Sequence, residues 1–290
     1  MESESVVFRM RSWMWLLLVF FGMLGMLLPY GFLEMFFDRA STLWAAGVIS
    51  VVGSAAMCGL YALVCRWVER RPVSELSLRR LVPDTSKGWL AGGGAMALSV
   101  LGLWLVGVYA VTSASPDWWG VVRDLLLFLF AAVAEELVCR AILLRTLEER
   151  WGTVVALVVS CLFFGFMHMG NDGATVWSCL ALALSAVEAA CFVYSRNLWM
   201  PIGAHWAWNF VQGNVLGVPV SGIDMGHSVV QASLSGPEWL TGGAFGAEAS
   251  VVTVVITAGV SAWLLWLAYK KGNFRPFRCP WRWVRRKLEV

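Results

Sequence analysis

Residues 249–270 read ASVVTVVITAGVSAWLLWLAYK, and the only charged side chain in this stretch is that of Lys270, at its end. A helix needs about 20 consecutive, predominantly apolar residues to cross the hydrocarbon core of a bilayer. A helix at the surface of a soluble protein instead carries a polar face along its length. The stretch therefore predicts a membrane-spanning helix.

Apolar runs of similar length recur along the whole chain. Working outward from residues 249–270, we find further runs, separated by charged or polar interruptions, at approximately 198–216, 174–194, 153–170, 125–147, 89–113, 42–66 and 13–36. We find no internal repeat and no low-complexity segment. The predicted fold class is therefore all-α: a polytopic transmembrane helical bundle of about eight spans, forming a single membrane domain over residues 1–290.

The composition excludes other classes of protein. The 290 residues are 59% hydrophobic and only 14% charged, whereas an average soluble domain is about 45–50% apolar and about 25% charged. Disordered chains combine low hydrophobicity with high charge, so disorder is excluded as well. The net charge is only +3, and the one dense basic cluster, residues 270–287, directly follows an apolar run. We therefore expect this cluster to face lipid headgroups, and we expect no nucleic-acid partner.

The distribution of Lys and Arg predicts the orientation in the membrane. With the amino terminus in the cytoplasm, the 66–87 loop and the tail 271–290 are both cytoplasmic, and only Arg39 and Arg123 fall outside. The longest opposite loop, 217–248, contains no Lys or Arg. Because cytoplasmic loops carry an excess of basic residues, we predict a multi-pass protein of the cell membrane with both termini cytoplasmic.

The seven cysteines are interpreted as packing residues. None forms a CxxC pair, and all but Cys279 lie within apolar runs. A free cysteine in such a run behaves as a small apolar side chain. We therefore expect neither a disulfide framework nor a zinc site, and no cofactor.

Ionisable residues within the apolar runs are the candidates for function, because each costs several kcal/mol in a bilayer. In the 125–147 run, Glu136 and Arg140 are four residues apart and share a helix face. They are expected to neutralise each other, and removing Glu136 would leave Arg140 unpaired. Glu135 points about 100° away and has no full partner, as a general base requires. The alternative is a structural charge cluster that joins helices.

Two other runs carry histidines at helical spacing. Phe164 and His168 are four residues apart, and so are His205 and Asn209. Each pair alone is more typical of hydrogen bonding between membrane helices. Together with Glu135, on three different predicted helices, they indicate a catalytic site in which His205 and Asn209 can stabilise an oxyanion.

The three patterns EExxxR, FxxxH and HxxxN, in this order on separate runs, resemble the CAAX protease and bacteriocin-processing family, also called the Abi family. The resemblance extends from Glu135 to Asn209 and implies a catalytic core within residues 125–216. The segments Gly217–Gly222 and Thr241–Gly246 are similar to those of bacterial members. The members of this family are intramembrane proteases of the glutamic type.

The resemblance also implies roles for the residues that match. Glu135 corresponds to the glutamate that activates the hydrolytic water, and Glu136 and Arg140 to its supporting pair. His168 corresponds to the histidine that helps to hold this water.

His205 and Asn209 correspond to the pair that stabilises the oxyanion. The implied function is an intramembrane endopeptidase that processes a membrane-associated protein or peptide precursor, with the lipid bilayer as its surroundings and without a metal or cofactor.

Other functions remain open from the residues alone. Two histidines and two glutamates can also hold zinc, although no HExxH is present, so a metal-dependent protease is an alternative mechanism. A noncatalytic membrane scaffold or regulator and a proton-coupled transporter are alternatives of another class. Convergence of Glu135, His168 and His205 on one site would distinguish them. From the run boundaries, however, these three residues are expected at different depths in the membrane.

Two further ionisable residues lie outside the matching patterns. Glu188, in the 174–194 run, is interpreted as lining a wet cavity or pairing with another helix. His227, in the 217–248 loop, is assigned no role.

Overall fold

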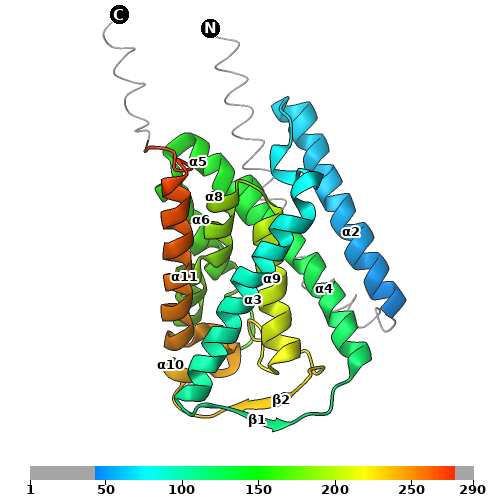
Figure 1. The fold of residues 1–290 in the computed structure, drawn as a ribbon, viewed down its shortest axis with the longest axis vertical. Coiled ribbons are helices and arrows are strands. Elements are labelled where there is room, and N and C mark those ends of the chain that lie inside the picture. Colours follow the sequence, from blue (N-terminus) through cyan, green and yellow to red (C-terminus); the bar gives the residue numbers. More distant parts are fainter. Residues whose placement is uncertain (1–42, 278–290) are drawn as a thin grey trace, which may run out of the picture.

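A computed structural model describes residues 43–277. The longer helices lie roughly along the long axis of the molecule (Figure 1). The predicted span 13–36, Arg39, Cys279 and residues 278–290 of the predicted tail lie outside the described residues. Within them, the chain is largely helical, so the predicted all-α membrane fold is confirmed.

The longer helices and the two strands of the described chain are α2 (Leu43–Val64), α3 (Leu81–Leu105), β1 (Tyr109–Ser113), α4 (Trp118–Glu136), α5 (Arg145–Trp151), α6 (Thr153–Met167), α7 (Val176–Ser185), α8 (Val187–Ser195), α9 (Trp199–Phe210), β2 (Gln231–Leu234), α10 (Glu238–Thr241) and α11 (Val251–Lys270). Short π-helical segments occupy Cys65–Glu69, Leu137–Leu144 and Val211–Val215, and short 3₁₀ turns occupy Ser74–Leu76, Leu78–Arg80, Gly243–Phe245 and Ala247–Ala249.

The outer surface of the bundle is that of a membrane protein. Four helical segments are long and apolar enough to cross a bilayer: Leu43–Glu69, Leu78–Leu105, Val176–Ser195 and Val251–Lys270. Large apolar side chains on three of them face outward, as Trp44, Leu90 and Trp263 do. On helices long enough to span a bilayer, outward apolar side chains of this kind are expected to face lipid. The other described runs form shorter helices, α4, α6 and α9, packed among these segments.

Glycines permit a close helix contact between α3 and α9. A Cβ atom added at Gly88 would lie 2.1 Å from the carbonyl oxygen of Met200, and one at Gly92 would lie 2.0 Å from that of Ala204. From the other side, a Cβ at Gly203 would lie 2.4 Å from the carbonyl oxygen of Thr85. Small residues spaced by four allow the backbones of membrane helices to touch. This contact fixes α9, which carries His205, against the long helix α3.

We expect the Gly92→Ala variant to be destabilised, because its new methyl group overlaps the backbone of α9 at Ala204. Overpacking of a tight contact typically costs about 1–3 kcal/mol. Gly94→Ala is the matched control on the same helix, since a Cβ at Gly94 meets nothing within 4 Å. Melting temperatures in one detergent would measure the difference. Equal melting of the two variants would contradict the packing argument.

The predicted span 89–113 is wrong at its carboxyl end. The helix ends at Leu105, and Gly107 adopts a φ of +79°, a conformation that β-branched and other L-residues disfavour. The following residues form β1, which pairs with β2 in antiparallel register, Tyr109 opposite Leu234. The β-branched residues Val108, Val111 and Thr112 and the aromatic Tyr109 favour a strand once the helix has stopped.

The predicted span 174–194 is interrupted. Ala186 adopts a φ of +49°, which separates α7 from α8. The carbonyl oxygen of Ser185, freed by this break, accepts a hydrogen bond from the Ser261 hydroxyl on α11, and Thr257 donates to the Ser185 hydroxyl at 3.1 Å. Backbone groups in a membrane must be satisfied in this way. The break places Glu188 in the first turn of α8.

Candidate active site

The candidate residues line or support one cavity of about 550 Å³ in the bundle. Helix α4 supplies Glu135, α6 ends beside His168, and α9 supplies His205 and Asn209; all four side chains line the cavity. The rest of the wall combines apolar and polar side chains from several elements. The apolar ones are Phe128, Ala131, Phe164, Leu182, Trp208, Val220, Ile223 and Met225, and the polar ones are Arg123, Ser185, Glu188, Ser221, Asp224 and Glu248. An apolar pocket with a few convergent polar groups is the usual form of a binding site.

Glu135 lies between the two histidines. Its Oε2 atom is 3.8 Å from Nε2 of His168 and 3.9 Å from Nε2 of His205. This oxygen has no hydrogen-bond partner among the described residues, although it is buried. The expectation that the three residues differ in depth is therefore wrong, and the structure brings them together.

The ring of His168 is oriented by its own helix. Nδ1 lies 2.8 Å from the carbonyl oxygen of Phe164, one turn earlier. A carbonyl oxygen only accepts hydrogen bonds, so Nδ1 carries the proton and Nε2 is directed at Glu135. Gly165 permits α6 to pack closely here, because a Cβ would lie 2.0 Å from the carbonyl oxygen of Cys179 on α7.

The ring of His205 is oriented by Glu136. Its Nδ1 atom lies 3.0 Å from Oε1 of Glu136, whose side chain is fully buried. The Phe164 ring packs edge-on against His205 at 5.7 Å between centroids and tilted against His168 at 5.0 Å. Phe164 therefore separates and supports both imidazoles, which gives the FxxxH spacing a physical reason.

Arg140 lies behind the histidines, and it is only 1% exposed. Its Nε atom is 3.2 Å from Oε2 of Glu136, as the spacing of four predicted, even though the chain is π-helical from Leu137. Its Nη2 atom is 3.7 Å from Oε2 of Glu188, and its guanidinium lies 4.6 Å from the centroid of the Phe164 ring. Arg140 thus joins α4, α6 and α8.

Glu188 was interpreted as a residue that lines a cavity or pairs with another helix, and in the structure it does both. It lines the cavity, and it pairs with Arg140 across the helices. The spacing patterns alone did not reveal this, because the contact depends on the break at Ala186 and on the packing of α8 beside the π-helical segment.

Glu248 is a cavity residue that the sequence analysis missed. It is 1% exposed, lines the same cavity and accepts a hydrogen bond from Nε1 of Trp208 at 3.2 Å. Burial raises the pKa of Glu248 above its usual value, against the opposing effects of Ser221, Trp208 and His168. An acidic residue between alanines, just before an apolar run, was the only signal for it in the sequence.

The 217–248 segment forms part of the cavity wall, whereas His227 within it lies apart from the catalytic candidates. Ser221, with a φ of +49°, and Met225 line the wall. His227 instead lies 3.3 Å from Oδ2 of Asp124, near the start of α4. It therefore connects the loop to α4.

Comparison with known proteins relates the chain to a family of proteases. A family model described as Type II CAAX prenyl endopeptidase Rce1-like matches residues 117–211. This range contains all six catalytic candidates: Glu135, Glu136, Arg140, His168, His205 and Asn209. No curated protein and no solved structure matches the chain. The bacterial character inferred from residues 217–222 and 241–246 stays a prediction.

Proposed function

We propose that this chain, whose residues 117–211 match the Rce1-like CAAX endopeptidase family model, hydrolyses a peptide bond in or near the membrane with a water molecule activated by Glu135. The observation that carries the proposal is the approach of the Glu135 carboxylate to Nε2 of both His168 and His205 on the cavity wall. Ionisable groups inside a membrane cost free energy, so three of them brought together from three helices indicate a shared function.

The proposed reaction begins with a water held between Glu135 and His168. Glu135 accepts a proton as the water oxygen attacks the carbonyl carbon of the scissile peptide bond. The tetrahedral intermediate carries an oxyanion, to which Asn209 donates a hydrogen bond. His205, in its doubly protonated form, donates a second hydrogen bond from Nε2 while Nδ1 donates to Glu136. Glu135 then returns its proton to the amide nitrogen, and the bond between carbon and nitrogen breaks. The products are a carboxylic acid and an amine, with no covalent enzyme intermediate.

Glu136 and Arg140 are positioning residues in this proposal. Glu136 accepts from Nδ1 of His205 and so keeps Nε2 of that ring turned toward Glu135. Arg140 offsets the charge of Glu136 where water is excluded. A fixed, buried hydrogen-bond partner of this kind sets the tautomer and the orientation of an imidazole.

The proposed substrate is a membrane-associated protein or peptide precursor. The apolar part of the cavity wall suits the apolar side chains of such a segment, and the lipid bilayer surrounds the enzyme. We further propose that the chain is a multi-pass protein of the bacterial cytoplasmic membrane, because residues 217–222 and 241–246 resemble those of bacterial members. The excess of basic residues in the 66–87 loop and in the tail favours an orientation with both termini cytoplasmic.

The experiment that tests this function does not require the substrate to be identified in advance. Membranes from cells that express the wild type and from cells that express Glu135→Gln are compared by mass spectrometry of protein termini. We expect new termini that appear with the wild type and not with the variant. Identical sets of termini at equal expression would contradict a protease.

We expect cleavage to be independent of metal ions, because the carboxylate and the two imidazoles suffice to activate water. Isolated membranes would be treated with a strong chelator and then with zinc, while one of the new termini is followed over time. An unchanged rate supports the glutamic mechanism. Loss of cleavage in the chelator and recovery with zinc would show a metal-dependent protease instead.

A further inference from the structure

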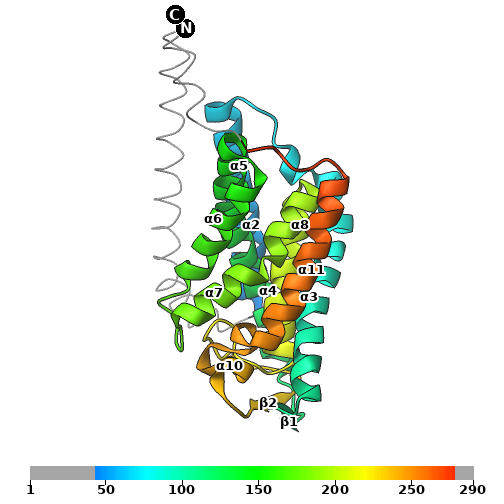
Figure 2. The ribbon, with the colours of Figure 1, turned by 90° about the vertical axis from the view of Figure 1, so that its left-hand side faces the viewer.

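The two ends of the described molecule differ in charge. At one end lie α5 and the chain that follows α11 (Figure 2). The segments at this end and the start of α3 carry nearly all described basic residues outside the cavity, which are Arg66, Arg70, Arg71, Arg79, Arg80, Lys87, Arg145, Arg150, Arg196, Lys270, Lys271 and Arg275. They also carry the acidic residues Glu69, Glu75, Asp84, Glu148 and Glu149, so the basic residues are in excess there. At the other end lie β1, β2 and α10 (Figure 2). The start of α4, α10 and the loops near this end carry Asp117, Asp124, Asp172, Asp224 and Glu238 and, among the described residues, the single basic residue Arg123. We call them the basic end and the acidic end.

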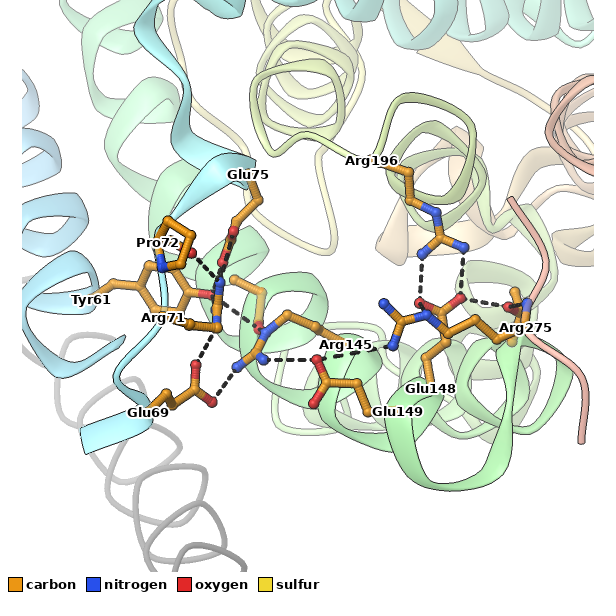
Figure 3. Close-up of polar contacts among 12 residues, drawn as sticks. Tyr61, Glu69, Arg71, Pro72, Glu75, Arg145, Glu148, Glu149, Arg196 and Arg275 are labelled. Atoms are coloured by element: carbon orange, nitrogen blue, oxygen red, sulfur yellow. Dashed lines mark hydrogen bonds and ion pairs between the residues drawn. The ribbon is translucent and has the colours of Figure 1, made fainter. Parts of the chain in front are cut away.

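Ion pairs join the elements of the basic end (Figure 3). Glu148 of α5 accepts hydrogen bonds from both terminal nitrogens of Arg196, at 2.5 and 2.9 Å, and lies 3.7 Å from Nε of Arg275. Arg145 lies 2.8 Å from Glu69 and so connects α5 to the segment after α2. These contacts tie together chain segments that are distant in sequence, and they close the bundle at this end.

Behind Glu135, toward α5, the charged side chains are buried and paired with one another. Glu136 and Arg140 are at most 1% exposed, and Glu188 pairs with Arg140. These buried, paired side chains pack against the cavity next to Glu135, so the exposed lining residues have to be sought elsewhere on its wall.

On the acidic side, the cavity reaches the surface. Its wall there consists of Ser221, Ile223, Asp224 and Met225, together with Arg123 at the start of α4. Ile223 is 41% exposed, and Asp224 is exposed as well, although both line the cavity. Residues that line the cavity and are also exposed lie at its opening, which we call the mouth.

We infer that peptide substrates reach the cavity from the acidic end, and that this end faces the non-cytoplasmic side of the membrane. The asymmetry of basic residues places the basic end in the cytoplasm. The substrate would then be a segment of an exported or membrane-anchored precursor on the far side of the membrane. This substrate class rests on the proposed protease activity, whereas the side of access does not.

The charge at the mouth predicts which peptide segments bind there more readily. Asp224 at the mouth and Asp172 and Asp117 nearby give this end a negative field, opposed only by Arg123 among the described basic residues. Opposite charges raise the local concentration of a ligand at a cleft. A peptide segment with basic residues beside its apolar part is therefore favoured over an acidic one.

Cysteine labelling in oriented membrane vesicles tests the side of access. Three matched serine-to-cysteine variants keep the side-chain size: Ser74→Cys at the basic end, Ser233→Cys at the acidic end and Ser221→Cys on the cavity wall. The probe is a trimethylammonium methanethiosulfonate reagent, which carries a fixed positive charge and does not cross membranes. The unchanged chain, whose described cysteines are buried or half-buried, gives the background.

In right-side-out vesicles we expect Ser233→Cys and Ser221→Cys to be modified and Ser74→Cys to be modified only after detergent is added. In inside-out vesicles we expect the reverse. Modification of Ser221→Cys from the side of Ser74→Cys would overturn the inference, and so would its modification only in detergent. An orientation in which Ser233→Cys faces the cytoplasm would overturn it too. Labelling needs no cleavage, so its outcome is independent of the comparison of protein termini.

Discussion

The Glu135→Gln variant is expected to lose cleavage and to keep its fold. Loss of a general base typically lowers a rate by a factor of about 10²–10⁴, and by more if the same group also orients the water. Glutamine keeps the shape of the side chain, and Oε2 of Glu135 accepts no hydrogen bond that the substitution would remove. The rate at which a wild-type terminus appears, together with the melting temperature in detergent, measures both effects.

Glu238→Gln is the control for this experiment. Glu238 is exposed in α10, away from the cavity wall, so the same chemical change there should leave rate and melting temperature unaltered. If Glu135→Gln retains cleavage while it melts normally, the assignment of the general base is wrong. If it fails to fold, Glu135 has a structural role that the contacts do not indicate.

The largest loss of stability is expected for Arg140→Met. Methionine has a similar length but no charge, so Glu136 and Glu188 would lose the cation between them inside the bundle. Removing one partner of a buried ion pair typically costs about 3–5 kcal/mol. Unfolding in detergent measures this cost, and Arg79→Met, at an exposed position of the basic end, is the control.

A compensating variant makes the second prediction sharper. Changing Glu136 and Glu188 to glutamine in the Arg140→Met background removes the two uncompensated charges, so part of the lost stability should return. An Arg140→Met variant as stable as the wild type, or a triple variant less stable than the single one, would contradict the ion-pair account.

Glu136→Gln is expected to cost less than Arg140→Met. The sequence spacing alone suggested that loss of Glu136 leaves Arg140 unpaired. In the structure Glu188 remains 3.7 Å from Arg140, and a glutamine oxygen can still accept from His205. The difference between the two variants, measured in the same detergent, tests whether Glu188 shares the charge of Arg140.

The sequence alone predicted the membrane class and the helices, because both follow from local properties of the chain. Apolar runs such as 42–66 and 249–270 became α2 and α11 within a few residues. The spacing of four likewise placed Glu136 beside Arg140 and Phe164 beside His168, since positions four apart share a helix face. The break at Ala186 and the strand after Gly107 were missed, because α7, α8 and β1 depend on partners distant in sequence, Ser261 and β2.

What only the tertiary structure decided is how the three patterns meet. Helix spacing states which side chains share a face, but not how far one helix slides or tilts along another. That is set by packing, such as the glycine contact of α3 with α9 and the contact of Gly165 with α7. The same packing placed Glu188 beside Arg140 and folded Ser221 and Glu248 onto the cavity. These contacts join residues from separate elements, and no local pattern encodes them. The sequence patterns predicted the candidate residues, but not the geometry of the cavity that brings them together.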